Sequence, residues 1–127
     1  MKRILFIATI ILIFGGLTSC DKDNFGYETT VEFTAEGGTK VITGREAIYT
    51  LSIGTYDGDE QSAEDVEEEG VETIMAVHSG WLTATAKKFS KEITLTAEPN
   101  TTGKRRVLYV YGMVNNQSTD IKVIQAK

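Results

Sequence analysis

From Thr29 onward, the chain is a series of short runs in which apolar and polar residues alternate, separated by turn-forming clusters. In the run TTVEFTAE, Val31 and Phe33 fall on one side, and Glu32 and Thr34 fall on the other. Alternation with a period of two is typical of a half-buried β-strand, and threonine and β-branched residues favour that structure. The sequence has no long segment with helical periodicity. This pattern restricts the chain to all-β folds.

The same alternation recurs to the end of the chain. The run AIYTLSI at 47–53 is interpreted as one strand, and later runs are ETIMAV, WLTATA, EITLTAE, RVLYVYGMV and DIKVIQ. Gly37-Gly38 and the clusters NTTGK and NNQST mark turns, since glycine and asparagine tolerate the backbone angles of turns. Several short antiparallel strands in about 100 residues favour a β-sandwich.

The first 19 residues have a different character. A basic head, Met1-Lys2-Arg3, precedes an uncharged run from Ile4 to Leu17, which is typical of a secretory signal peptide. That run has 14 residues and includes two glycines, whereas a membrane-spanning helix needs about 20 apolar residues. We therefore expect residues 1–19 to be a cleaved signal peptide.

Cys20 is the single cysteine of the chain, so it cannot form an internal disulfide. The sequence Leu17-Thr18-Ser19-Cys20 resembles a bacterial lipobox. In that class the thiol receives a diacylglyceryl group, cleavage precedes the cysteine, and the new amino terminus is often acylated. Two or more acyl chains hold a protein stably on a membrane. The resemblance implies a lipoprotein anchored through Cys20, and the alternative is an unmodified buried cysteine.

The residues after Cys20 bear on where the anchor lies. Lys22-Asp23 resembles the short export signals of surface lipoproteins in Bacteroidetes-type bacteria. We therefore expect the protein at the outer membrane, where exposure at the cell surface is one alternative. The sequence does not decide on which side of that membrane the protein lies. Residues 20–28 are interpreted as the lipidated cysteine and a short polar tether.

The expected mature chain keeps 108 of the 127 residues, with 29–127 as one domain large enough for a hydrophobic core. Because Lys2 and Arg3 leave with the signal peptide, the net charge changes from −5 to −7. Nucleic-acid binding needs clustered basic residues to neutralise phosphates, so the acidic balance argues against a nucleic-acid partner. It also argues against purely electrostatic docking on anionic lipid.

Residues 57–72 carry nine acidic residues and no basic one. Like charges repel, so this segment is interpreted as a long solvated loop, with a partly helical excursion as the other structural reading.

A calcium site is the alternative reading of the same segment. Asp57, Asp59 and Glu68 would fill positions 1, 3 and 12 of an EF-hand loop. Position 5 is Gln61, however, and position 6, where a glycine must turn the chain, is Ser62. We expect no metal site.

The second half of the chain carries a more specific set of features. In order, they are an early Gly-Gly, a Trp-Leu pair, an alternating strand, an asparagine followed by an arginine, an apolar strand and a final Val-x-Gln. Here they are Gly37-Gly38, Trp81-Leu82, Ile93 with Leu95, Asn100 with Arg106, Val107 to Val110, and Val123 to Gln125. Together they resemble the BACON domain of Bacteroidetes over roughly residues 31–126.

This resemblance implies an immunoglobulin-like β-sandwich of about seven strands. It also implies a carbohydrate-associated setting, because BACON domains often stand beside carbohydrate-active modules. The sugar-binding role of such domains is inferred from that company more than from a defined site.

Catalysis has little support in the sequence. A nucleophilic mechanism needs an activated nucleophile and a base, yet His78 is the single histidine and Cys20 is assigned to lipid. His78 is interpreted as a turn residue before a strand. Zinc sites built from histidine and cysteine are excluded by residue count. We expect a protein that is not an enzyme and has no cofactor.

Sugar binding, in contrast, needs flat aromatic surfaces and a few polar groups. Alternation predicts that Leu108 and Val110 face the core while Tyr109 and Tyr111 lie outside, where their rings could stack on a sugar or cover a neighbouring strand. Trp81, the single tryptophan, is a third candidate, although core packing is its alternative role. The candidate glycan-binding residues are therefore Tyr109, Tyr111 and Trp81.

Two functional hypotheses follow from the sequence. The first is a lipoprotein that binds glycans or assists polysaccharide-handling proteins through an exposed aromatic patch. The second is a structural spacer or an assembly module of the adhesion type, which contacts only protein. Clustering of the three aromatic residues on one open face favours the first hypothesis, and their burial favours the second.

Overall fold

The computed structural model describes residues 24–55, 60–62, 64–66 and 73–127. The expected signal peptide and Cys20 lie outside the described residues, as do Asp57, Asp59 and Glu68. The described part of the chain forms ten β-strands. Within it, no helix has the length and apolar character needed to cross a membrane.

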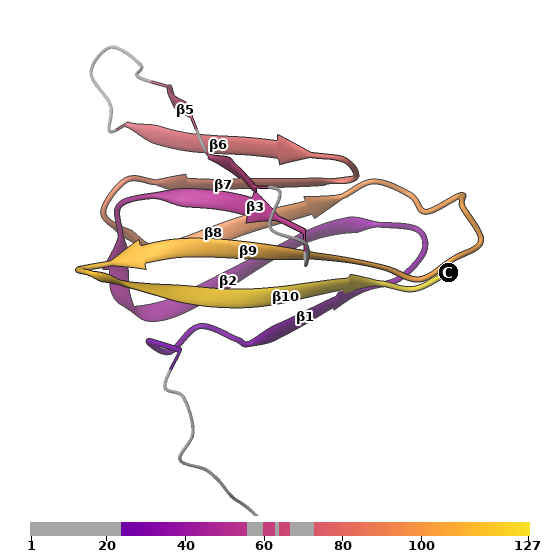
Figure 1. Ribbon diagram of the computed structural model, residues 1–127, viewed down its shortest axis with the longest axis horizontal. Coiled ribbons are helices and arrows are strands. Elements are labelled where there is room, and N and C mark those ends of the chain that lie inside the picture. The colour runs from indigo at the N-terminus through magenta and orange to yellow at the C-terminus, as the bar shows by residue number, and fades with distance from the viewer. Residues whose placement is uncertain (1–23, 56–59, 63, 67–72) are drawn as a thin grey trace, which may run out of the picture.

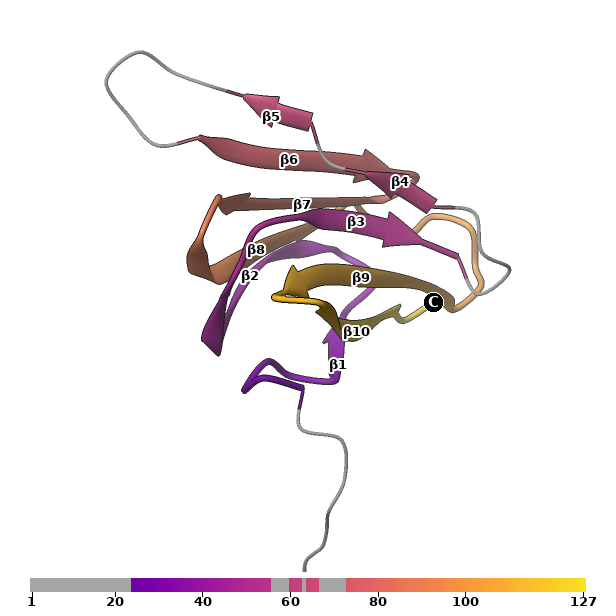
Figure 2. The ribbon, with the colours of Figure 1, turned by 60° about the vertical axis from the view of Figure 1, so that its left-hand side comes forward.

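The strands form two five-stranded sheets that pack as two layers (Figures 1 and 2). The first sheet has the order β1 (Thr30–Phe33), β10 (Gln117–Gln125), β9 (Arg106–Val114), β3 (Leu51–Gly54) and β4 (Glu60–Ser62). The second has the order β2 (Gly38–Ile48), β8 (Ser90–Ala97), β7 (Leu82–Lys87), β6 (Ile74–Ser79) and β5 (Glu64–Val66). β1 and β10 are parallel, and the other pairs are antiparallel. The predicted all-β sandwich is confirmed, with ten strands where about seven were expected.

The core lies between the two sheets and consists of the inward-facing residues of the alternating runs. Val31 and Phe33 of β1 are buried, as the alternation of TTVEFTAE predicts. The completely buried aliphatic side chains come from both layers and include Ile48, Ile53, Leu82, Ile93, Leu95, Val110, Ile121 and Val123. Burial of these apolar side chains is the main force that holds the layers together.

The run at 47–53 differs from its prediction as a single strand. β2 ends at Ile48 and β3 begins at Leu51, so the chain passes from one sheet to the other across Tyr49 and Thr50. Ile48 and Leu51 are therefore both buried, although strict alternation places them on opposite faces. The period-two rule fails here because it holds only while a strand stays in one sheet.

The acidic segment also differs from the predicted loop. It contains β4, paired with β3, and β5, paired with β6, and the rest of the segment lies outside the described residues. Each is a three-residue strand at the edge of its sheet. Short edge strands tolerate charged residues because one side of the strand faces no neighbour.

Residues 24–28, expected to belong to a tether, pack against the sandwich instead. Asn24 and Tyr27 are 4% and 3% exposed. The Asn24 amide bonds Asp120 of β10 in both directions: Nδ2 donates to the Asp120 carbonyl and Oδ1 accepts from its N–H, each at 3.0 Å. The Tyr27 ring lies against Gly44, where an added Cβ would come within 2.2 Å of it. Sequence alone did not indicate this docking, because residues 24–28 carry no strand period.

The two ends of the sandwich hold different connections (Figure 1). The end that we call proximal holds the β2–β3, β7–β8 and β9–β10 connections. Asn24 bonds Asp120, three residues after the start of β10 at that end. The opposite, distal end holds the β1–β2, β6–β7 and β8–β9 connections and the C-terminus. At the distal end Gly37 and Gly38 have φ values of 83° and 136°, as the predicted turn requires.

Candidate functional site

Tyr109 and Tyr111 lie on the face of the first sheet that points away from the core. Leu108 and Val110 are buried beneath them, as predicted, and both tyrosine side chains are half-buried. Their ring centroids are 6.5 Å apart and the ring planes differ by 16°. The two rings thus form a nearly parallel aromatic pair along β9.

Strand register gives this pair its neighbours. On β10, Lys122 lies opposite Tyr109 and Asp120 lies opposite Tyr111, and both are half-buried. On β3, the residues opposite the same two tyrosines are Gly54 and Ser52, which are small and buried. We call Tyr109, Tyr111, Asp120 and Lys122 the tyrosine face.

The tyrosine face combines the groups that sugars require. Aromatic rings offer apolar area for the C–H faces of a pyranose, while a carboxylate and an ammonium can bond its hydroxyls. The Asp120 carboxylate also accepts a 2.8 Å hydrogen bond from the Ser118 hydroxyl. Asp120 and Lys122 could not be predicted from the sequence, because their place beside the tyrosines depends on the register between β9 and β10.

Trp81, the third residue predicted for the glycan site, does not join the tyrosine face. It lies at the β6–β7 turn and is 8% exposed, as part of the hydrophobic core. A ring so buried has no free face for a sugar, so Trp81 is a core residue. The sequence was compatible with both a glycan-binding and a core role for Trp81. It did not distinguish them, because the side chain that packs on the ring comes from a distant strand.

That partner is Arg106, the first residue of β9. Its guanidinium carbon lies 5.0 Å from the centroid of the Trp81 ring, which is a cation–π arrangement. Arg106 Nε donates to Gln125 Oε1 at 2.8 Å, and Nη2 donates to the Pro99 carbonyl at 3.2 Å. A single side chain therefore connects the β6–β7 turn, the β8–β9 loop and β10.

Gln125 extends the same network into the interior. It is completely buried, and its Nε2 donates to the carbonyls of Glu98 at 2.8 Å and Thr34 at 3.1 Å. Both hydrogen-bonding groups of the Gln125 side chain are thus satisfied, as burial requires.

Asn100 shapes the neighbouring loop. It is buried, and its Nδ2 donates to the carbonyls of Lys104 at 2.7 Å and Ala126 at 2.9 Å. Its Oδ1 accepts bonds from the N–H and the hydroxyl of Thr102. The contacts described above join four of the positions that carry the BACON resemblance, and they stabilise the fold at the distal end. These positions are Trp81, Asn100, Arg106 and Gln125.

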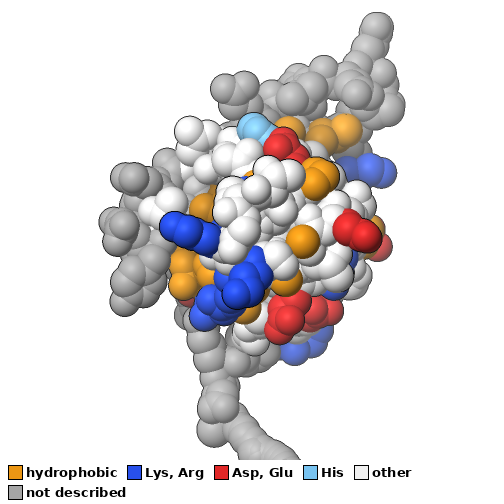
Figure 3. Space-filling view, turned by 90° about the vertical axis from the view of Figure 1, so that its right-hand side faces the viewer, with side chains coloured by type: hydrophobic (Ala, Val, Ile, Leu, Met, Phe, Trp, Pro, Cys, Tyr) orange, Lys and Arg blue, Asp and Glu red, His pale blue; other side chains and the backbone are white. Residues whose placement is uncertain are grey.

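The distal surface outside this network is mixed in character. Figure 3 views the molecule from that end and shows basic and acidic side chains among uncharged ones.

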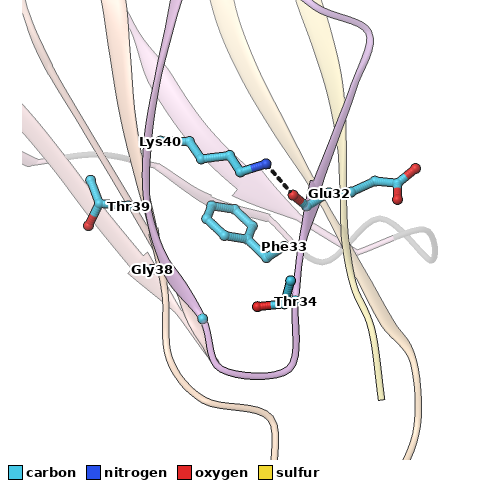
Figure 4. Close-up of a pocket in the computed structure, with 7 residues that line it drawn as sticks. Glu32, Phe33, Thr34, Gly38, Thr39 and Lys40 are labelled. Atoms are coloured by element: carbon cyan, nitrogen blue, oxygen red, sulfur yellow. Dashed lines mark hydrogen bonds between the residues drawn. The ribbon is translucent and has the colours of Figure 1, made fainter.

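A hollow of about 210 Å³ lies between β1 and β2 (Figure 4). Lys40 crosses it: Nζ donates to the Glu32 carbonyl at 2.6 Å and lies 5.4 Å from the centroid of the Phe33 ring. Figure 4 shows the Glu32 carboxylate pointing away from the hollow. The Phe33 ring is 4% exposed and the volume is below the usual 300–1,000 Å³ of ligand pockets, so we assign it no ligand.

His78 is exposed on β6, and its Nδ1 lies 2.8 Å from the Thr83 hydroxyl on β7. It is a strand residue and not the predicted turn residue. Within the described residues, no group of three or more histidine, cysteine, aspartate or glutamate residues could hold a metal ion. Gln61 and Ser62 lie in the extended strand β4, where an EF-hand loop would need a turn.

Comparisons with known proteins give similarity to solved structures. No protein-family model matches the chain, and no curated protein matches it. A Bacteroides thetaiotaomicron protein solved by NMR is 16% identical with a TM-score of 0.48, over 78% of this chain and 76% of that one. A Bacteroides ovatus GH5 xyloglucanase, in complex with a XXXG heptasaccharide, is 18% identical with a TM-score of 0.47, over 77% of this chain. The matched part of this chain spans 17% of that enzyme's length.

Proposed function

We propose that this protein is a lipid-anchored, extracytoplasmic module of BACON type that binds carbohydrate and is not an enzyme. The observation that carries the proposal is the nearly parallel pair of Tyr109 and Tyr111 on the outer face of the first sheet, with rings 6.5 Å apart. Asp120 and Lys122 beside them supply polar groups of both signs. The ligand class is a glycan whose sugar rings stack on the tyrosines.

The expected binding mode follows from the shape of the site. An outer sheet face with two half-buried rings is open, so it suits a side-on contact with an extended glycan chain better than enclosure of one sugar. Contacts of this kind bury a modest area, so a single module is expected to bind weakly. The overall affinity rises when many copies of the module on one surface bind the same glycan chain. Anchoring at a membrane supplies that multiplicity.

The anchor part of the proposal rests on the N-terminal sequence. The basic head, the apolar run and Leu17-Thr18-Ser19-Cys20 support acylation of Cys20 and location at the outer membrane. Polysaccharide-handling proteins on the same membrane are the proposed protein partners.

Affinity electrophoresis through gels that contain soluble polysaccharides tests the binding part. Retarded migration of Cys20–Lys127 is expected for at least one polysaccharide. Tyr109→Phe and Tyr111→Phe keep the ring and should keep most of the retardation, whereas Tyr109→Ala and Tyr111→Ala should lose it. If the alanine variants and the native protein are retarded equally, the polysaccharide binds at residues other than the two tyrosines.

Metabolic labelling with a radioactive fatty acid tests the anchor part. Bacteria that express the full chain should incorporate label and hold the protein in the membrane fraction, while Cys20→Ala should show neither. If the native protein incorporates no labelled fatty acid, Cys20 is not acylated and the anchor part of the proposal is wrong. The test of glycan binding does not depend on that result.

A protein-contacting spacer is the second candidate, favoured by one observation. Trp81 is buried, and with Arg106 it serves the fold at the distal end. Absence of retardation in every polysaccharide gel, with the labelling test positive, would favour this candidate.

A further inference from the structure

Phe89, at the tip of the β7–β8 connection, is 70% exposed. Its φ is +67°, a backbone conformation that bulky residues rarely adopt and that glycine or asparagine would adopt with less strain. The tip is nevertheless held in place, because the Phe89 N–H donates to the Ile48 carbonyl at 2.7 Å. The chain thus presents a large apolar ring to the outside at a conformational cost, with little burial in return.

Basic residues surround this ring in the sequence Lys87-Lys88-Phe89-Ser90-Lys91. Lys87 and Lys91 are exposed, and Lys88 is half-buried, with its N–H donating to the Thr73 carbonyl at 2.9 Å. An apolar ring among lysines is the composition of segments that lie at a membrane interface, where the ring enters the acyl boundary and the ammonium groups meet phosphates.

Two backbone hydrogen bonds to β2 set the position of this tip relative to the docked N-terminal segment. The Phe25 carbonyl accepts from the Arg45 N–H at 2.7 Å, and Ile48, three residues further along β2, bonds Phe89. Three residues of strand span about 10 Å, so the tip and the docked N-terminal segment lie close together at the proximal end (Figures 1 and 2).

The chain between anchor and fold is short. Asn24 is fixed to β10, and Cys20 precedes it by four residues, which reach at most about 14 Å when fully extended. An acyl chain on Cys20 therefore brings the proximal end, with its Phe89 tip, to the membrane surface. The distal end lies away from that surface by roughly the 30 Å length of a nine-residue strand.

We infer that the β7–β8 tip, Lys87 to Lys91, is a second membrane contact: Phe89 inserts at the boundary between phospholipid headgroups and acyl chains, and so holds the sandwich end-on. This inference rests on the acylation of Cys20 in the proposed function. The acyl chains on Cys20 supply the attachment, and the tip adds a second point of contact that fixes the orientation of the sandwich.

Acidic residues also lie near the tip. Glu46 precedes Ile48 on β2, and Glu92 follows Lys91 on β8. The acidic run that ends at Glu72 directly precedes Thr73, whose carbonyl bonds Lys88. The apolar ring, which does not depend on lipid charge, is therefore the main element, and the lysines add attraction to anionic headgroups.

Tryptophan fluorescence on vesicles tests the inference. Cys20–Lys127 is coupled through its single thiol to a maleimide lipid in phosphatidylcholine vesicles, with or without phosphatidylglycerol, that contain brominated phospholipid. In Phe89→Trp the new tryptophan should shift to shorter emission wavelength and lose intensity to the bromine quencher. Native Trp81 is the internal control, since it is buried at the distal end.

Val41→Trp is the matched control, because among the residues that the structure describes Val41 is the other exposed large apolar one, at 57%, and it lies on the outer face of the second sheet. Quenching at position 89 but not at 41, in either lipid composition, supports the inference. Absence of quenching at 89 in both compositions overturns it, and so does equal quenching at 41, since the sandwich would then lie on its side.

Limited trypsin digestion of the native sequence needs no substitution. Coupling to vesicles should slow cleavage after Lys87, Lys88 and Lys91, while cleavage after the exposed distal Lys104 and Arg105 stays unchanged. Unaltered cleavage at the tip would contradict the inference. Chemical coupling replaces cellular acylation here, so a negative result is separate from failure of the fatty-acid labelling test.

Discussion

The Arg106 guanidinium lies over the Trp81 ring, 5.0 Å from its centroid, and joins the first residue of β9 to the β6–β7 turn of the other sheet. These two residues are separated by 25 positions and carry part of the BACON resemblance. Their contact gives that resemblance a physical meaning: the residues close the distal end of the sandwich. A glycan site must then be sought on other residues of the chain.

Replacement of Arg106 by alanine should lower the free energy of unfolding by about 2–3 kcal/mol. The loss combines the cation–π contact with hydrogen bonds to Gln125 and Pro99, and it leaves the buried Gln125 Oε1 without this donor. Urea denaturation measures the change. Arg105→Ala is the control, because Arg105 is exposed, and it should change stability by less than about 0.5 kcal/mol. Equal effects of the two variants would show that the network contributes little.

Asn24→Ala should cost about 2–3 kcal/mol, since it removes the two 3.0 Å bonds to Asp120 and leaves buried backbone groups without partners. Hydrogen exchange should also speed up at the Asp120 N–H. Asn116→Ala, at an exposed position of the β9–β10 turn, is the control and should be neutral. An unchanged melting temperature in Asn24→Ala would mean that residues 24–28 form the tether that the sequence suggested.

The ionisation of Tyr27 should make the stability of the protein depend on pH in the alkaline range. Burial, and secondly the negative charge of Glu46, raise the pKa of the Tyr27 hydroxyl above its usual 10.0. The folded state then holds this proton more tightly than the unfolded state. Its contribution to stability is complete below pH 10.0 and is lost as the pH rises through the higher pKa of the folded state.

Tyr27→Phe removes this titration and also the 2.7 Å bond to the Glu46 carbonyl. At pH 7 the variant should be less stable by about 1 kcal/mol. Above pH 10 its stability should fall less steeply than that of the native protein, as urea midpoints at successive pH values would measure. Parallel pH curves for the two proteins would contradict the assignment.

Alternation allowed the sandwich, the inward-facing Leu108 and Val110, and the Gly37-Gly38 turn to be predicted. Each of these follows from local rules, since a strand that faces a core must alternate and a tight turn requires positive φ. The break at Tyr49 and Thr50 did not follow, because the transfer of a strand between sheets is decided by the packing of the whole core.

The candidate site was only half predictable for a related reason. Tyr109 and Tyr111 share a face by alternation within one strand, whereas Asp120 and Lys122 join them through the register of β9 with β10. For Trp81 the sequence left open both a place beside the tyrosines and a place in the core, because its environment depends on Arg106 from another sheet. Sequence gives the residues that one strand brings together, and tertiary pairing decides the rest.

A glycan array probed with soluble Asp21–Lys127 would measure whether the tyrosine face binds glycans. Tyr109→Ala, Tyr111→Ala and the control Val41→Ala, on the outer face of the other sheet, are compared at equal concentration after their melting curves show that they are folded. We expect binding by the native protein and by Val41→Ala, with a loss of at least tenfold, about 1.4 kcal/mol, in each tyrosine variant. If the native protein binds no glycan on the array, or if binding survives both tyrosine substitutions, the tyrosine face is not a glycan site.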